Sequence, residues 1–161
     1  MTTSSDSAAP ASAASPAPAV QRRALTQLFW ASVTWIALGL IMGLFYREFT
    51  KAHGFPDGFT GQLAIVHTHL LAVGALVMLI VLVLEKAFRL SASKLFRWFF
   101  WIYNVGLLLT AAMMTWHGIL EVLKVEASKA IPGIAGAGHI LISAGFVLLL
   151  ITLWKGIRRA S

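Results

Sequence analysis

Long apolar runs separated by short polar stretches make up most of the chain. Four of these runs lie at about 27–46, 62–84, 96–123 and 133–154. Roughly 20 apolar residues in an α-helix cross the hydrocarbon core of a bilayer, and a helix satisfies its own backbone groups in lipid. The pattern therefore predicts four transmembrane helices. Because the connections are short, neighbouring helices are expected to be antiparallel, which gives an all-α, up-down four-helix bundle.

The composition supports a membrane protein. The 161 residues are 58% hydrophobic and 12% charged, and their mean hydropathy is +0.80. An average soluble domain is about 25% charged, and a small globule keeps much of its surface in water. These values exclude a soluble fold. The absence of cysteine excludes disulfides, cysteine-ligated zinc, iron–sulfur clusters and cysteine nucleophiles.

Positive charge gathers on one side of the predicted membrane. Nine Lys and Arg residues fall on the side of the termini and four on the other, which predicts both termini in the cytoplasm. Residues 1–23 begin as an Ala/Ser/Pro-rich stretch and are predicted to be a disordered cytoplasmic tail, with residues 24–157 forming the transmembrane domain. The net charge of +7 thus orients helices and does not indicate nucleic-acid binding.

Four of the five histidines are predicted to lie at one depth, in the outer half of the membrane. His67 and His69 are near the outer end of the second helix, His117 near that of the third, and His139 near that of the fourth, whereas His53 is in an outer loop. Ionisable groups in apolar spans usually face a bundle interior or a cavity. The four histidines are therefore the candidate functional site.

Helical spacing predicts which faces meet around this site. His67 and His69 point about 200° apart on a straight helix, so one is expected in the main site and the other on a neighbouring helix, the headgroups or a second site. Small, polar or polarisable residues form stripes on the third, fourth and first helices, which are expected to converge near the histidines. The stripes are Gly106, Thr110, Met113, Met114, His117 and Glu121; Gly136, His139 and Ser143; and Trp35, Gly39, Met42 and Tyr46.

Haem b is the leading interpretation of the cluster. Haem iron takes axial histidines, and a four-helix bundle offers ligands from facing helices inside an apolar wall. We expect His69 and His139 to be the first choice as ligands, followed by His67 and His117. Tyr46 and Arg47 either hold the haem propionates or anchor the first helix at the interface.

Two other interpretations remain open from the residues alone. Copper or another transition metal would use His67 or His69 together with His117 and His139, with thioethers from Met113 and Met114. In the third interpretation the histidines only form hydrogen bonds between helices of a non-catalytic accessory subunit with no cofactor. Glu121 would either orient the His117 imidazole or face water, and Asn104 is expected to bond between helices.

The stretch 66–74, Val-His-Thr-His-Leu-Leu-Ala-Val-Gly, resembles a known helix. It is similar to the His-x-His helix near the carboxyl end of the catalytic subunit of haem-copper oxidases, particularly the cbb3-type and nitric-oxide-reductase branches. The resemblance implies that His67 ligates a high-spin haem and His69 a low-spin haem. Residues 100–119 are similar to the next helix of those subunits, and the fourth predicted helix is compatible with their last one.

The chain departs from the oxidase pattern in ways that limit its function. It is too short for the other helices, the copper site and the complete set of haem ligands, and His117 and His139 have no counterpart there. A complete oxidase or reductase is therefore not expected. The whole chain also resembles small bacterial four-helix membrane proteins of a domain-of-unknown-function family, which implies a multi-pass protein of the bacterial cytoplasmic membrane.

These observations predict a membrane protein that binds haem b for electron transfer or for sensing a diatomic gas. The bilayer is its expected surrounding, and a second copy or an electron-transfer partner of the respiratory chain its expected protein contact. No nucleotide loop, nucleophile–base pair or pair of catalytic carboxylates is present in the sequence.

Overall fold

The computed structural model describes residues 18–128 and 130–160, and these are all-α. Four helical spans are long and apolar enough to cross a membrane, and each matches one of the predicted segments. The second span is one continuous helix with a π-helical middle. In chain order the elements are α1 (Ala19–Ala52), α2 (Gln62–Thr68), the π-helix η1 (His69–Leu76), α3 (Val77–Phe88), the 3₁₀ turn η2 (Leu90–Ala92), α4 (Lys94–Val122) and α5 (Ala130–Ala160).

The helices α1, α3 and α5 run beyond the apolar runs that predicted them. Polar residues such as Arg22 and Arg47 continue the helix because they are good helix formers, although they lie outside the apolar stretch. Residues 19–23, predicted as the end of the tail, are the first turns of α1. The rest of the predicted tail, residues 1–17, lies outside the described residues.

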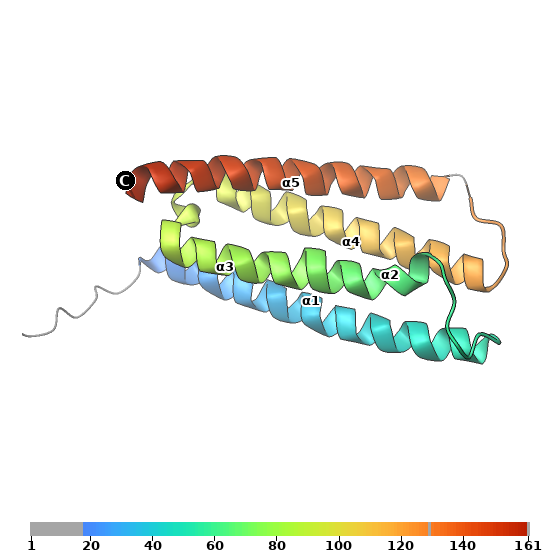
Figure 1. Cartoon of the computed structure of the whole chain (residues 1–161). Helices are drawn as coiled ribbons and strands as arrows, with labels where there is room; N and C mark the ends of the chain where they lie inside the picture. The colour runs from blue at the N-terminus through green and yellow to red at the C-terminus, as the bar shows by residue number, and fades with distance from the viewer. Residues whose placement is uncertain (1–17, 129, 161) are drawn as a thin grey trace, which may run out of the picture.

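The spans alternate in direction between two ends of the molecule (Figure 1). We call the end that holds Ala19, η2 and Ala160 the terminal end, and the end that holds Ala52, Gln62 and Ala130 the loop end. The antiparallel order matches the prediction. Orientation relative to the membrane stays a prediction.

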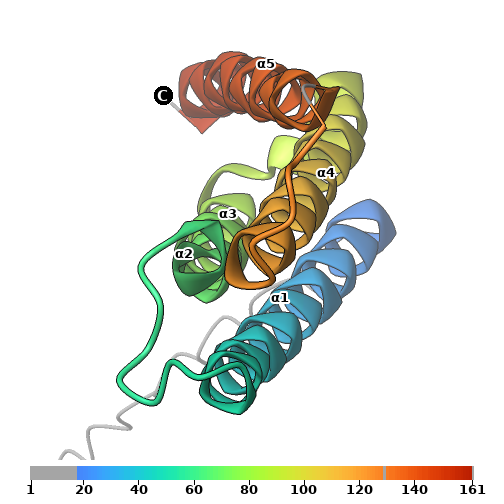
Figure 2. The same cartoon turned by 90° about the vertical axis from the view of Figure 1, so that its right-hand side faces the viewer.

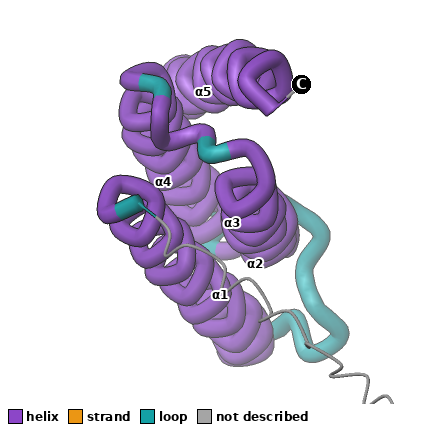
Figure 3. The backbone as a smooth tube through the Cα atoms, turned by 90° about the vertical axis from the view of Figure 1, so that its left-hand side faces the viewer, coloured by secondary structure: helices purple, strands orange, loops and turns teal. Residues whose placement is uncertain are grey.

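The four spans form an open array and not a closed square. Seen along the helices, α1 packs on the second span, the second span on α4, and α4 on α5 (Figures 2 and 3). Consequently α1 and α5 lie on opposite sides of the molecule (Figure 2). The predicted convergence of three stripes at one interior point is therefore replaced by packing between successive pairs of helices.

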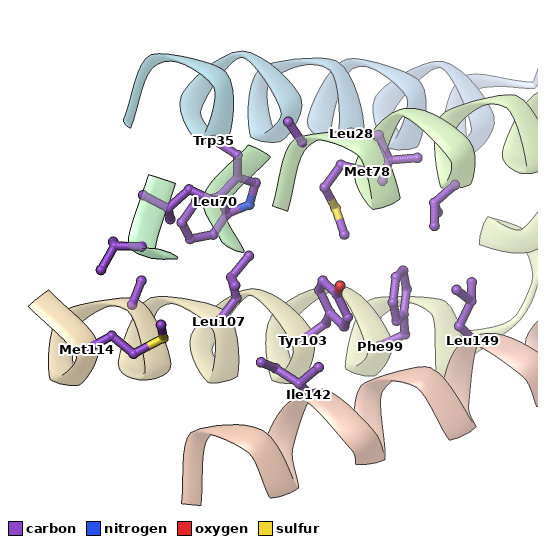
Figure 4. Close-up of a cluster of buried hydrophobic side chains, with 14 of the residues drawn as sticks. Leu28, Trp35, Leu70, Met78, Phe99, Tyr103, Leu107, Met114, Ile142 and Leu149 are labelled. Atoms are coloured by element: carbon purple, nitrogen blue, oxygen red, sulfur yellow. The ribbon is translucent and has the colours of Figure 1, made fainter. Parts of the chain in front are cut away.

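The core lies between α1, the second span and α4 and continues to α5 (Figure 4). Phe99, Tyr103 and Leu107 of α4 are fully buried, as is Met78 of α3. The side chains on the outer faces of all four spans are large and apolar, which suits contact with lipid tails. The fold thus has a narrow apolar core and many large apolar side chains on its outer surface.

Close helix approach depends on glycines, most clearly between α4 and α5. A Cβ at Gly106 would lie 2.9 Å from the carbonyl oxygen of Gly138, and a Cβ at Gly145 would lie 2.9 Å from Cβ of Tyr103. Small residues let membrane helices pack backbone to backbone. The part of the predicted stripe at Gly106 and Thr110 therefore serves the α4–α5 interface.

Two polar side chains of α4 bond to the neighbouring spans. Trp35 Nε1 donates to Asn104 Oδ1 at 2.7 Å, which confirms the interhelical role predicted for Asn104. Tyr103 donates its hydroxyl to the Val73 carbonyl oxygen at 2.7 Å, within η1. A π-helix departs from the usual i to i+4 ladder, and such segments often occur at functional sites. Here the π-helix begins at His69.

Candidate functional site: a histidine pocket

A pocket of about 480 Å³ opens at the loop end between α2–η1, α4 and α5. Three of the predicted histidines, His69, His117 and His139, line it together with Met113 and Met114. Each of the three elements contributes one imidazole. We call this the histidine pocket. Its remaining lining residues are Gln62, Ile65, Ile131, Pro132, Ala135 and Gly136.

The pocket exists because the start of α5 has little side-chain volume. Its first turns contain Pro132, Gly133, Ala135 and Gly136, and a Cβ at Gly136 would meet nothing within 4 Å. By contrast, a Cβ at Gly138, two residues later, would collide with the hydroxyl of Thr110 on α4. The two helices are therefore in backbone contact from Gly138 onwards and leave a space before it.

Two of the pocket imidazoles share one local arrangement. His69 Nδ1 lies 3.3 Å from the Ile65 carbonyl oxygen, and His139 Nδ1 lies 3.0 Å from that of Ala135. A carbonyl oxygen only accepts, so Nδ1 carries the proton and donates. In the neutral ring Nε2 then keeps its lone pair, which is the state in which imidazole ligates a metal. In this arrangement the lone pair of each of the two rings lies on Nε2.

The third imidazole and the thioethers come from α4. His117 is half-buried, Met113 is half-buried and Met114 is 6% exposed. Met114 also belongs to the core, so its thioether packs against buried apolar side chains as well as lining the pocket. Such packing is the usual use of methionine. The α4 wall is therefore partly structural.

His67 lies on the other side of its helix. An ideal Cβ built at Gly43 of α1 would be 3.7 Å from Cβ and from Cγ of His67, and His67 does not line the pocket. This confirms that His67 and His69 face different neighbours. Within the described residues, His67 Nδ1 is buried and has no hydrogen-bond partner. The expected group of four histidines is therefore three in one pocket and one against α1.

The α1 stripe does not reach the histidine pocket, contrary to expectation. Trp35 lies against Gly74, and Gly39 lies against Leu71, both on η1. The stripe residues Trp35, Gly39, Met42 and Tyr46 lie outside the pocket lining. The reason is the open array, which places the second span between α1 and α5.

Tyr46 and Arg47, suggested as partners for haem propionates, also lie away from the pocket. The Tyr46 hydroxyl donates to the Phe59 carbonyl oxygen at 3.0 Å and accepts from the Phe59 N–H at 3.0 Å, which holds the loop between α1 and α2. Arg47 is exposed, with its Nε 3.6 Å from the carboxylate of Glu48. His53 is exposed at the end of α1, and its ring contacts that of Phe49 in a tilted arrangement with the centroids 4.3 Å apart.

Glu121 has a third role that the sequence interpretation did not contain. Its Oε2 accepts from the Gln62 backbone N–H at 2.9 Å, at the first residue of α2. A carboxylate at a helix N-terminus satisfies a free N–H and opposes the positive end of the helix dipole. Glu121 therefore fastens α2 to α4 beside the pocket.

Five lining residues were absent from the sequence prediction, and helical spacing gives the signal for four of them. Gln62 and Ile65 precede His69 by seven and four residues, and Pro132 and Ala135 precede His139 by the same steps. Residues at these separations share a helix face. Ile131 precedes His139 by eight residues and also lies on that face.

Among residues 18–128 and 130–160, no three His, Cys, Asp or Glu side chains form a group able to hold a metal ion. The predicted copper or zinc site of three imidazoles therefore has no support from the structure.

Comparison with known proteins gives a family and no activity. No curated protein and no solved structure matches the chain. The predicted similarity to haem-copper oxidases is thus not shown by these comparisons. A family model described as "Protein of unknown function (DUF2871)" matches residues 25–156, which cover all four spans except the ends of α1 and α5. The chain belongs to this DUF2871 family of proteins of unknown function.

Proposed function

We propose that this membrane protein binds one b-type haem in the histidine pocket and uses it for electron transfer or for sensing a diatomic gas. The observation that carries the proposal is the gathering of three imidazoles from three elements in one apolar-walled space of about 480 Å³. Ligand pockets in proteins typically have volumes of about 300–1,000 Å³. Apart from Gln62 and the three imidazoles, the residues that line the pocket are apolar, which suits a porphyrin.

The ligand set favours haem over a bare ion. A tetrahedral zinc or copper site needs three or four protein ligands around one point, and the described residues hold no such group. Haem supplies four nitrogens of its own and takes one or two axial imidazoles. His69 and His139, each with Nδ1 bonded to a carbonyl oxygen, would supply these through Nε2. Bound haem would supply a one-electron couple or a gas-binding iron.

The protein's own residues would set the other properties of the site. Ile65 and Ile131 would exclude water from one wall, and Gly136 leaves room beside α5. His117 is the second choice as a ligand, because no hydrogen bond fixes its ring in the described structure. His67 is outside the proposal, since it faces Gly43 of α1.

The test is the visible spectrum of the protein purified in mild detergent after growth with ample haem precursor. We expect a Soret band that shifts on reduction, with one haem b per chain by the pyridine haemochrome assay. His69→Ala and His139→Ala should each lose the band or change the spin state of the iron. His53→Ala is the matched control, because His53 Nδ1 also lies 2.8 Å from a carbonyl oxygen but outside the pocket.

Several outcomes would reject this function. A wild-type protein without a Soret band would do so, as would loss of haem in His53→Ala or His67→Ala but not in His69→Ala. Stoichiometric copper or zinc in a haem-free sample would replace haem by a metal ion, in which case Met113→Leu should weaken binding. Absence of both would leave an accessory membrane protein whose histidines stabilise helix packing.

We also propose that the terminal end faces the cytoplasm and that the histidine pocket opens toward the outer leaflet. Nine Lys and Arg side chains on the terminal side against four on the loop side support this orientation. Reporter fusions at residue 161 and in the α1–α2 loop should show a cytoplasmic C-terminus and an external loop. The reverse pattern would refute the orientation and leave haem binding to its own test.

A further inference from the structure

A second space lies at the opposite end of the molecule from the histidine pocket. It has a volume of about 600 Å³ and lies between the first turns of α1 and the segment that runs from η2 into α4. Three cations line it, Arg23 from α1 and Lys94 and Arg97 from α4. We call it the cationic groove. Ser93 caps the first turn of α4 at the same place, where it accepts from the Leu95 N–H through its hydroxyl and from the Phe96 N–H through its carbonyl oxygen.

The three cations have no acidic partner among the described residues. No carboxylate lies within salt-bridge distance of Arg23, Lys94 or Arg97. The acid at the terminal end of the described chain is Glu85, which is fully buried. Its carboxylate accepts from Ser91 N–H at 2.8 Å and from Ser91 Oγ at 2.5 Å. Glu85 does not line the groove, although Ser91, its hydrogen-bond partner, does. Among the described residues, the lining therefore contains three cations and no carboxylate.

The rest of the groove is apolar and aromatic. Trp98 and Trp101 line it and are 59% and 56% exposed, next to Phe96 and Phe100. Trp side chains prefer the boundary between headgroups and acyl chains, and the ends of spans lie at that depth. The groove therefore places fixed cations beside an apolar wall at a membrane interface.

We propose that the cationic groove binds one phospholipid with an anionic headgroup. The side chains of Arg23, Lys94 and Arg97 would bind the phosphate. The part of an acyl chain nearest the headgroup would lie along Phe100 and Trp101. Arg binds phosphate oxygens in a bidentate manner, whereas Lys acts as a point charge. The three cations fit the headgroup of a phospholipid, and the aromatic wall fits its acyl chain. A free anion would need only the cations, and nonspecific attraction to anionic lipids would need no groove.

The experiment compares two triple variants of the full chain by native mass spectrometry in detergent. The first removes the groove cations as Arg23→Gln, Lys94→Gln and Arg97→Gln. The second removes three exposed cations of the same end that do not line the groove, as Lys86→Gln, Lys155→Gln and Arg158→Gln. The probes are phosphatidylglycerol and phosphatidylcholine with the same acyl chains, and inorganic phosphate alone.

We expect tight binding of phosphatidylglycerol at one per chain, and at least tenfold weaker binding of phosphatidylcholine. One basic residue near a membrane surface contributes about fivefold in affinity, so the groove variant should lose at least tenfold. The control variant should lose less than threefold. A charge-retaining variant with Arg23→Lys, Lys94→Arg and Arg97→Lys should keep binding to within about fivefold, which separates charge from damage to the fold.

Three results would overturn the proposal. Equal losses in the two triple variants would mean a diffuse collar without a specific groove. Equal binding of the two lipids would remove the role of the anionic headgroup. Competition by inorganic phosphate at the concentration of the lipid would assign the groove to a free anion. Haem binding is read at the other end of the molecule, so the two proposals succeed or fail separately.

Discussion

Replacement of Gly118 by Ala tests the closest approach between α4 and the second span. A Cβ at Gly118 would lie 2.6 Å from Cβ and 2.7 Å from Cα of Leu63, and closer still to the Leu63 nitrogen. Ordinary contact begins at 3.4 Å, so the Leu63 Cβ alone requires the two helices to separate by about 0.8 Å, and the Leu63 nitrogen requires more. Because the obstructing atoms belong mainly to the backbone of Leu63, a change of rotamer cannot relieve the clash.

The magnitude follows from two opposed effects. Overpacking a fitted interface costs about 1–3 kcal/mol, and the higher helix propensity of Ala returns up to about 1 kcal/mol. We expect a net loss of about 1–2 kcal/mol in the free energy of unfolding. Leu63 and Val66, both fully buried, would lose packing as α2 moves. Gly133→Ala is the matched control, because a Cβ there meets nothing within 4 Å and only the propensity effect remains.

The assay is reversible unfolding in mixed micelles, with sodium dodecyl sulfate as the denaturant and far-ultraviolet circular dichroism as the signal. Gly133→Ala should be as stable as the wild type or more stable by up to about 1 kcal/mol. Gly118→Ala should unfold at a lower mole fraction of denaturant. Equal stability of the two variants would refute the backbone-contact argument at this interface.

Three further substitutions test polar contacts of the same interfaces, each by the same unfolding assay. Tyr103→Phe leaves the Val73 carbonyl oxygen without its 2.7 Å bond and should lower the free energy of unfolding by about 1–2 kcal/mol. An unchanged stability would show that the Val73 carbonyl oxygen does not need the Tyr103 hydroxyl as a hydrogen-bond donor. Trp35→Phe removes the 2.7 Å bond to Asn104, whose contribution of about 0.6–1.7 kcal/mol should vanish when Asn104 is already Leu, whereas the loss of buried ring packing should remain. Glu121→Ala should cost about 0.5–2 kcal/mol at the start of α2, whereas Glu121→Gln keeps an acceptor and should recover most of it; equal losses would assign the effect to charge.

The sequence was sufficient for the spans because lipid imposes one strong rule, an unbroken helix of about 20 apolar residues. It was also sufficient for the opposite faces of His67 and His69, since two residues turn a helix by about 200°. The sequence was insufficient to predict which helix packs against each of these faces. The stripe at Trp35 and Gly39 does mark a packed face, but a stripe carries no information on which helix packs against it.

The closed interior site was predicted from the order of the helices in the chain. That order does not determine how the four helices are arranged around one another. Gly136, near the start of α5, was predicted to belong to a stripe that packs against the other helices. A Cβ added there would meet no atom within 4 Å, and Gly136 instead lines the space beside His139. Small size permits either close contact or a void, and the choice depends on the tilt of α5 against α4. The capping role of Glu121 required the same tertiary information, because Gln62 is distant in sequence.

The π-helix η1 lies where the second span contacts both α1 and α4. Buried residues of this span recur at four-residue steps through η1, at Leu70, Gly74 and Met78. Each four-residue step passes a full α-helical turn by about 40°, so three such positions would drift off the core of a regular helix. The wider π turn of η1 rotates less per residue and reduces this drift. Tyr103 stabilises that turn through the Val73 carbonyl oxygen, four residues after His69. We therefore expect Tyr103 to help position His69, and Tyr103→Phe should alter the spectrum of the proposed haem although the Tyr103 side chain lies outside the pocket lining.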